Sequence, residues 1–307
     1  MARDSGRAGR GWPLPPPETF VPALALAGAA ALGLVLGSFL NVVILRLPAG
    51  RSVVTPRSAC VGCGTLIRWF DNIPVLSWIL LGGKCRACRM PISARYAVVE
   101  LLTGALFTLA AWALLTRNDG QWREPAAWCR LAVAETYLAA LVALSFIDLD
   151  HRILPDRITR PGMVAGPVLC ALLAPGFQPV RLLPDLPVRG AALLLSLSGV
   201  LAGWGLIRLV AWAGEKAFRR EAMGMGDSKL MGMIGGFLGP LAVPGVLAIA
   251  SFLGSGIGLV AMAVTRDREI PFGPFLAAAS VPLMLFPLEV VEMFVQVQEW
   301  IRGWMGG

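Results

Sequence analysis

The hydrophobic residues of this 307-residue chain come in long blocks. The first block runs from Phe20 to Leu45 without a charged residue, which is longer than the roughly 20 positions that a helix needs to cross a bilayer. Further blocks follow near residues 97–116, 131–149, 161–175, 190–213, 230–247, 245–264 and 272–295. The pattern therefore predicts about eight membrane-spanning helices.

A helical bundle is the fold class that these blocks predict, because lipid offers no partners for unpaired backbone groups. Composition agrees, since 56% of the residues are hydrophobic and only 15% are charged, against roughly 25% charged in an ordinary soluble domain. We expect an all-α polytopic membrane protein with a small cytoplasmic domain between its first two spans. The expected parts are a disordered N-terminal tail (1–18), a first transmembrane helix (19–47), a cytoplasmic domain (48–95), a transmembrane domain (96–296) and a C-terminal tail (297–307).

Lysine and arginine are distributed unevenly over the loops. If the N-terminus lies outside, the inner segments are 48–95, 150–160, 214–229 and 265–271. These segments hold 16 Lys and Arg, whereas the outer segments hold 8. The positive-inside rule favours this orientation, although three arginines in the N-terminal tail oppose it. The net charge of +8 therefore belongs to short cytoplasmic loops and indicates no nucleic-acid partner.

Four of the six cysteines form two C-x2-C pairs, Cys60 with Cys63 and Cys85 with Cys88, in the segment between the first two blocks. Two turns that each present a thiolate pair suit a tetrahedral zinc ion, and four thiolates leave no open position for catalysis. Two disulfides or four free thiols are the alternatives, and a cytoplasmic location disfavours disulfides. We expect a structural zinc that supplies folding energy to a small domain, with tight turns at Gly62, Gly64, Gly82 and Gly83.

The single histidine, His151, excludes a zinc site of the H-E-x-x-H type, and the chain has no G-x-S-x-G elbow and no Walker loop. Carboxylates remain. Asp148 ends one apolar block and Asp227 precedes another, so both are expected at the same depth on the same face of the membrane. Two adjacent carboxyls share a proton, so that one can activate water while the other polarises a carbonyl.

Two alternatives to this carboxyl pair stay open on spacing alone. Acids at such positions are often helix caps, and Asp150 and Asp156 compete with Asp148 for the first role. Gly224 and Gly226 flank the second aspartate, where the lack of side chains would let a substrate backbone approach.

Several segments resemble, in order, the motifs of the bacterial prepilin peptidases, the leader peptidases of type IV pilins and type II secretion pseudopilins. The resemblance spans roughly residues 35 to 280. Its segments are residues 37–48, the two C-x2-C pairs, 69–78, 92–96 with Glu100, 148–156, 224–229 and 271–274.

The resemblance implies an aspartic peptidase of the Gly-x-Gly-Asp kind, with Asp148 and Asp227 as its catalytic residues. The implied substrate is a prepilin or pseudopilin with a short basic leader before a hydrophobic helix. The implied location is the bacterial inner membrane, with the active site and the zinc domain on the cytoplasmic side. A proton-coupled transporter is the alternative class, because carboxylates near glycine-rich helices suit a carrier, but no internal repeat is visible.

Relatives of this long form commonly also methylate the new N-terminus with S-adenosylmethionine, so the resemblance implies this second activity and co-substrate. The segment Trp69 to Trp78 is our expected surface for the methyl donor. It offers aromatic faces for a cation, with Asp71 and Asn72 as polar partners. Anchoring of the domain at the membrane interface is the competing interpretation of its aromatic residues.

Overall fold

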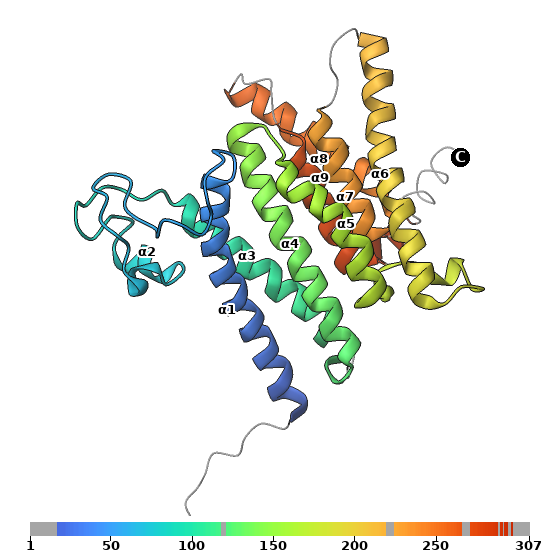
Figure 1. The fold of residues 1–307 in the computed structure, drawn as a ribbon, viewed down its shortest axis with the longest axis horizontal. Helices are drawn as coiled ribbons and strands as arrows, with labels where there is room; N and C mark the ends of the chain where they lie inside the picture. Colours follow the sequence, from blue (N-terminus) through green and yellow to red (C-terminus); the bar gives the residue numbers. More distant parts are fainter. Residues whose placement is uncertain are drawn as a thin grey trace, which may run out of the picture.

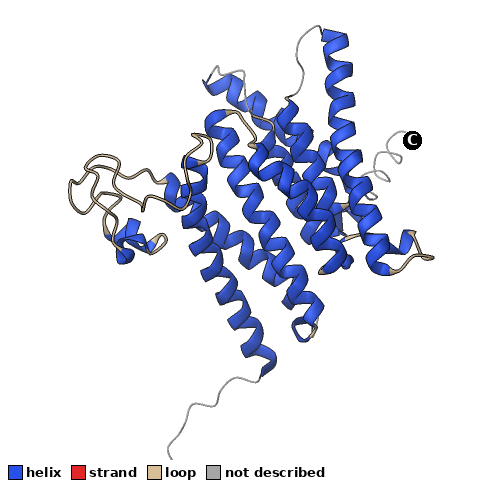
Figure 2. Ribbon diagram, in the orientation of Figure 1, coloured by secondary structure: helices blue, strands red, loops and turns tan. Residues whose placement is uncertain are grey.

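A computed structural model describes residues 17–117, 121–218, 224–265 and 271–287, together with 289, 290, 292, 293 and 296. This part of the chain contains helices and loops and no β-strand (Figure 2). The long helices are α1 (Pro17–Arg46), α3 (Arg95–Ala111), α4 (Pro125–His151), α5 (Asp156–Leu172), α6 (Val188–Phe218), α7 (Met225–Leu238), α8 (Ala242–Thr265) and α9 (Gly273–Leu285). The expected all-α class is confirmed.

Most of the predicted apolar blocks lie largely within one of these helices, but the predicted count of eight spans is not confirmed. Within the described residues, five helices are long and apolar enough to cross a membrane: α1, α4, α6, α8, and α3 with its π-helical continuation Trp112–Thr116. The other three, α5, α7 and α9, have 17, 14 and 13 residues. They are shorter than the roughly 20 residues that a perpendicular span requires.

The predicted span at 230–247 is wrong in its bounds, because α7 already ends at Leu238 and α8 begins at Ala242. Gly239 follows α7 with φ of 82°, a conformation that side chains rarely adopt, and its N–H donates to the Gly235 carbonyl at 2.7 Å. A side chain at Gly239 would also lie 2.3 Å from Gln178 Oε1. The short helix α7 and the start of the longer helix α8 therefore take the place of one continuous span.

Glycines set how closely the helices pack. On α1, a Cβ at Gly37 would lie 2.7 Å from Glu100 Cα of α3, so the two backbones nearly touch. On α6, a Cβ at Gly199 would lie 2.0 Å from the Gly235 carbonyl of α7. Small residues that allow close backbone approach are typical of helix association in lipid. Two packed groups result, α1 with α3 and α5 with α6 and α7, while α4 contacts both α1 and α9 (Figure 1).

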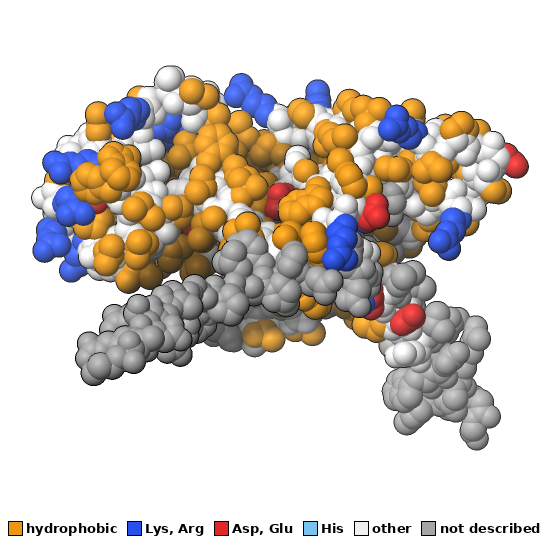
Figure 3. Space-filling model, turned by 90° about the horizontal axis from the view of Figure 1, so that it is seen from below, with side chains coloured by type: hydrophobic (Ala, Val, Ile, Leu, Met, Phe, Trp, Pro, Cys, Tyr) orange, Lys and Arg blue, Asp and Glu red, His pale blue; other side chains and the backbone are white. Residues whose placement is uncertain are grey.

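The outer surfaces of the bundle are apolar. Side chains such as Phe252 and Leu259 of α8 are 81% and 70% exposed. Figure 3 shows hydrophobic side chains spread over the face seen from below, with several Lys and Arg side chains at the end that holds residues 48–94 and others scattered elsewhere. An apolar exterior of this extent fits contact with lipid.

The segment 48–94 forms a separate lobe beside one end of α1, which we call the cysteine knob (Figure 1). It has little regular structure: a 3-10 turn at Trp69–Asn72, the short helix α2 (Leu76–Leu80) and two isolated β-bridges. A lobe of this size buries too little apolar surface to be stable on that basis alone, which is the situation in which small domains use metals.

Candidate active site

Asp148 lies in the last turn of α4 and is only 5% exposed. Arg152, with φ of 54°, ends the helix, and its N–H donates to the Asp148 carbonyl at 2.8 Å. The carboxyl of Asp148 points to the first residue of α9, where the Gly273 N–H donates to Oδ2 at 3.1 Å. A Cβ at Gly273 would lie 2.5 Å from that oxygen. The contact therefore depends on a glycine at the start of α9.

Asp227 is the third residue of α7, and its carboxylate accepts a hydrogen bond from the backbone of the N-cap residue Gly224. This is one half of a capping box, in which an acid at the third position satisfies the N-cap amide. Burial, followed by the nearby Asp148 carboxyl, raises the pKa of Asp227 to about 6. The two carboxyls are therefore close enough to act on each other's charge.

Leu154, in the turn between α4 and α5, fills the space between the two carboxyl-bearing regions. Its Cβ would lie 3.1 Å from a Cβ at Gly226, and its Cδ2 would lie 3.4 Å from one at Gly273. Close packing against Leu154 thus explains a glycine at position 226, and the sequence alone did not reveal this contact. Its role in admitting a substrate backbone stays a prediction.

Two helix N-termini, those of α7 and α9, meet at this carboxyl pair. Free backbone N–H groups and the helix dipole stabilise negative charge at such ends. The interpretation as helix caps is correct locally for Asp227, since it does bind its own N-cap. It does not account for the buried carboxyl of Asp148, which belongs to the C-terminal end of its own helix and binds the start of another.

The competing acids of this region are held by cations. Asp150 forms an ion pair with Arg95, which links α4 to α3. Asp156, the first residue of α5, pairs with Lys229 of α7 at 2.5 Å and with Arg160 at 2.7 Å. These pairs give both acids a structural task.

The four cysteines of the two C-x2-C motifs converge, with all their Sγ atoms within 4.8 Å of one another. Cys60 Sγ and Cys88 Sγ lie 3.7 Å apart, and all four thiols are free. Zn–S bonds of about 2.3 Å in a tetrahedron place sulfurs about 3.8 Å apart, so this donor set fits zinc in type, number and spacing. A hydrogen bond with the Thr65 hydroxyl, and then one with its backbone, lowers the pKa of Cys63 to about 6 and favours the thiolate.

The two halves of this cluster have the same backbone hydrogen bonds. Cys60 N–H donates to the Thr65 carbonyl and Cys85 N–H to the Met90 carbonyl, each at 2.9 Å. The residue four positions after each of these cysteines, Gly64 or Arg89, has positive φ. A glycine is required at position 62 for a steric reason, because a Cβ there would lie 2.2 Å from Met90 Sδ. Of the four glycines expected to make the turns, Gly64, Gly82 and Gly83 have positive φ.

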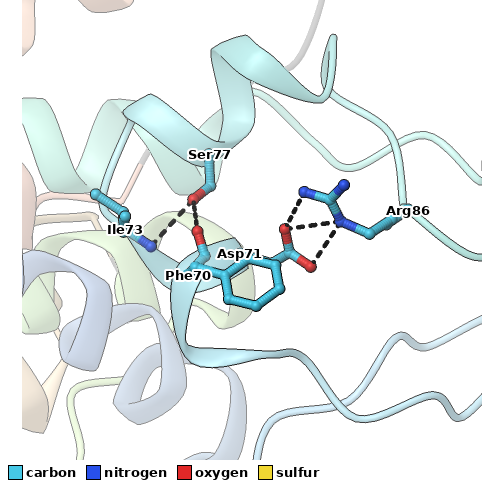
Figure 4. Close-up of polar contacts among 5 residues, drawn as sticks. All are labelled: Phe70, Asp71, Ile73, Ser77 and Arg86. Atoms are coloured by element: carbon cyan, nitrogen blue, oxygen red, sulfur yellow. Dashed lines mark hydrogen bonds and ion pairs between the residues drawn. The ribbon is translucent and has the colours of Figure 1, made fainter.

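Inside the knob, Asp71 is fully engaged with Arg86. The guanidinium donates to both carboxylate oxygens at 2.6 to 3.0 Å, and Ser77 ties the backbone of Phe70 to that of Ile73 (Figure 4). These hydrogen bonds with Arg86 hold the pKa of Asp71 below its usual range.

The tryptophans of the expected methyl-donor surface differ in their surroundings: one packs inside the knob and the other is exposed. Trp78 packs on Gly83, and its indole N–H donates to the Ile92 carbonyl at 3.1 Å, whereas Trp69 is 78% exposed. With Asp71 and Trp78 occupied inside the knob, only part of the segment Trp69 to Trp78 is available to a ligand.

Sequence reasoning gave no role to three residues near the carboxyl pair: Gly273, Leu154 and Lys229. A signal was present for Gly273, which lies in the Pro271-Phe-Gly-Pro274 segment. A glycine between prolines before an apolar block suggests a helix start with a steric restriction. Its partner could not be inferred, because the contact with Asp148 spans 125 positions.

A polytopic helical membrane protein with two converging carboxyls and a four-cysteine knob is the class that these features define. Comparison with known families shows which family of this class the chain matches. Residues 31–114 match the Bacterial Peptidase A24 N-terminal domain, and residues 136–259 match the Type IV leader peptidase family. The chain belongs to this leader peptidase family.

Individual relatives support this family assignment. A "Prepilin leader peptidase/N-methyltransferase" of Burkholderia pseudomallei (strain K96243) is 38% identical over 85% of this chain and 85% of its own length. One of Aeromonas hydrophila is 38% identical over 80% of this chain and 86% of its own length. One of Myxococcus xanthus is 42% identical over 76% of this chain but only 62% of its own length. No solved structure is significantly similar to the chain.

Proposed function

We propose that this protein is a membrane-embedded aspartic endopeptidase that removes the leader from type IV prepilins or type II secretion pseudopilins. Asp148 and Asp227 are its catalytic pair in this proposal. The supporting observation is the burial of Asp148 beside Asp227, where the ends of α4, α7 and α9 meet, in a chain of the leader peptidase family.

The chemistry needs one proton shared by the pair. The unprotonated carboxylate removes a proton from water, whose oxygen attacks the scissile carbonyl carbon, while the protonated carboxyl donates to the carbonyl oxygen. When the C–N bond breaks, the leaving amine takes up the proton that the pair holds. The pair regains one proton from a hydroxyl of the tetrahedral intermediate, so the two carboxyls return to their starting state. The amides of Gly224 and Gly273 hold the carboxylates in place.

A second activity, methylation of the new N-terminal amine, is part of the proposal because the relatives' names include it. The methyl group is supplied by the sulfonium of S-adenosylmethionine when this co-substrate is bound. Transfer to a neutral amine yields the N-methyl amine, S-adenosylhomocysteine and a proton. This reaction does not need the carboxyl pair.

The cysteine knob binds one structural zinc in this proposal, through Cys60, Cys63, Cys85 and Cys88. The spacing of the sulfurs supports it. Four protein ligands leave the metal no catalytic position, so its contribution is folding energy.

The protein lies in the bacterial inner membrane in this proposal, with the knob and the carboxyl pair on the cytoplasmic side. Support comes from the excess of Lys and Arg in the segments assigned to that side. In Figure 1 the C-terminal end of α4 and the start of α7 lie toward the same end of the bundle, and the knob lies beside the bundle at the C-terminal end of α1. A prepilin is itself a membrane helix with a cytoplasmic leader, so its scissile bond would reach this depth.

Co-expression with a type IV prepilin tests the proposal against the transporter alternative. The intact mass of the pilin should fall by the mass of its leader in the presence of this protein and rise by one methyl group. An unchanged pilin mass, with the protein present in the membrane, would contradict the proposed function. No observation in the structure favours a transporter.

A further inference from the structure

The last turn of α4, which carries Asp148, runs out into exposed residues. Leu149 is 53% exposed, and Asp150 and His151 after it are exposed as well. Helix ends with few buried contacts are the parts of a helix that open most easily. Gly273 holds the Asp148 carboxyl from the side of α9. One hydrogen bond to one oxygen does not by itself fix the rotation of the turn that bears the carboxyl.

Arg95, the first residue of α3, makes three contacts with this turn. Its guanidinium forms an ion pair with the Asp150 carboxylate, and Nη2 donates to the Phe146 carbonyl at 3.2 Å. Its Cζ also lies 5.3 Å from the centre of the Phe146 ring, within the range of a cation–π interaction. A cation at the C-terminal end of a helix is favoured by the helix dipole as well. A single guanidinium thus binds the turn on both sides of Asp148 in the sequence.

The two residues that Arg95 contacts lie on the opposite face of α4 from Asp148. Phe146 and Asp150 are four residues apart, so they share one face of the helix. Asp148 is two residues from each, which is a rotation of roughly 200° at 3.6 residues per turn. Arg95 therefore holds the turn from the side away from the carboxyl, while Gly273 contacts the carboxyl itself.

The start of α3 is itself held from two sides, which fixes the position of Arg95. Asn41 of α1, only 9% exposed, donates through Nδ2 to the Tyr96 carbonyl at 3.0 Å. The Glu100 carboxylate, in a residue 8% exposed, accepts the Val75 N–H of the cysteine knob at 2.7 Å. Satisfied buried polar contacts of this kind make a structure rigid. Arg95 therefore connects a firmly placed helix to an exposed turn.

We infer that Arg95 is a positioning residue for leader removal: it fixes the rotation of the last turn of α4 and so directs the Asp148 carboxyl to the Gly273 N–H. This role rests on the proposed peptidase function and adds a residue outside the carboxyl pair on which its rate depends. The alternative is that Arg95 only stabilises the packing of α3 against α4. Kinetics distinguish the two, because a positioning residue acts through Asp148 and a purely structural one does not.

Steady-state cleavage of a type IV prepilin by purified full-length Arg95→Gln and Arg95→Lys measures this role. A displacement of about 1 Å in a catalytic group costs on the order of 100-fold in rate, so Arg95→Gln should lower kcat by about 10- to 100-fold with KM unchanged. Lysine keeps the charge but lacks the planar fork that binds Asp150 and Phe146 together, so Arg95→Lys should fall between Arg95→Gln and the wild type. Arg51→Gln, at an exposed arginine of the knob, is the matched control and should keep the wild-type kcat.

The double variant Arg95→Gln/Gly273→Ala separates positioning from general stabilisation. A Cβ at Gly273 would lie 2.5 Å from Oδ2 of Asp148, so Gly273→Ala disturbs the same carboxyl directly. If both residues act through Asp148, their effects are not additive in free energy, and the double variant should be at most a few-fold slower than Gly273→Ala alone. Losses in kcat that multiply would make Arg95 an independent structural residue and overturn the inference. If Arg95→Gln does not accumulate in the membrane, Arg95→Lys takes its place in the same comparison.

Two further results would contradict the positioning role. A wild-type kcat in Arg95→Gln would overturn it, and so would a raised KM with an unchanged kcat, which would make Arg95 a substrate-binding residue. Cleavage by the wild type leaves the proposed peptidase function standing in either case. A wild type that does not cleave prepilin would instead contradict the proposed function, and the role of Arg95 with it.

Discussion

The amide of Gly273 reaches Oδ2 of Asp148 because no side chain keeps α9 away from α4. Replacing Gly273 with alanine would put a methyl carbon 2.5 Å from that oxygen, so the carboxyl or the helix must move. A displacement of about 1 Å in a catalytic group costs on the order of 100-fold in rate. We expect Gly273→Ala to lower the rate of leader removal by roughly that factor, as measured by pilin cleavage in membranes with matched enzyme levels.

Gly256→Ala in α8 is the control for this effect, since a Cβ there meets nothing within 4 Å. It should cleave at the wild-type rate. Equal activity of the two alanine variants would show that the contact between Gly273 and Asp148 does not position the carboxyl.

Asp227 gives a pH-dependent prediction. Burial and the neighbouring Asp148 raise its pKa from 3.8 to about 6, so between these values the folded protein binds more protons than the unfolded chain. The folded state therefore loses stability as the pH rises through this window, and the loss persists above it. Asp227→Asn removes the penalty. The thermal midpoint of the variant should match the wild type near pH 4 and exceed it above pH 6, by about 2–4 °C for each kcal/mol relieved.

Thermal unfolding of the two proteins in the same detergent, scanned from pH 4 to pH 8, measures this difference. A difference between the two thermal midpoints that is constant across the pH range would mean that the contribution of Asp227 to stability does not depend on its ionisation. A variant less stable than the wild type above pH 6 would mean that the carboxylate stabilises α7 through Gly224 more than its burial costs.

At the scale of elements, the cysteine knob should depend on its metal. The protein should bind one zinc per chain, and replacing Cys60 with serine should remove it, because three thiolates and a hydroxyl form a much weaker site. Elemental analysis of the purified protein measures the zinc content. Cys129→Ser in α4 is the control, since Cys129 lies outside the four-cysteine cluster and should leave the zinc in place. Zinc that survives replacement of all four knob cysteines would refute the assignment.

The positions of the helices were largely predictable from sequence, and their ends were not. Long apolar blocks predicted α1, α4 and α6, because hydrophobic length is a local property that the bilayer demands. The end of α7 depends on Gly239, whose positive φ is needed beside Gln178, a residue far away in sequence. Hydropathy continues past this glycine, so the pattern alone merged α7 with the start of the next helix.

At the scale of the whole molecule, the site was predictable in its parts and not in its assembly. The sequence predicted that Asp148 and Asp227 lie at equal depth, because each adjoins an apolar block. The sequence could not show that the first residue of α9 contacts Asp148 or that Lys229 forms an ion pair with Asp156. Both contacts depend on how helices far apart in sequence pack. The cysteines were the easier case, because their spacing alone defines a tetrahedral donor set.

The central claim is that Asp148 and Asp227 together cut the leader peptide, and the most direct test is the rate of prepilin cleavage by Asp148→Asn and Asp227→Asn. Asparagine keeps the shape of the side chain but cannot exchange the proton, so each variant should lose about 10²- to 10⁴-fold in rate while it still inserts in the membrane. Asp150→Asn, which loses an ion pair with Arg95, and Asp156→Asn, which loses ion pairs with Lys229 and Arg160, should keep substantial activity. Near-normal cleavage by either Asp148→Asn or Asp227→Asn would contradict the account.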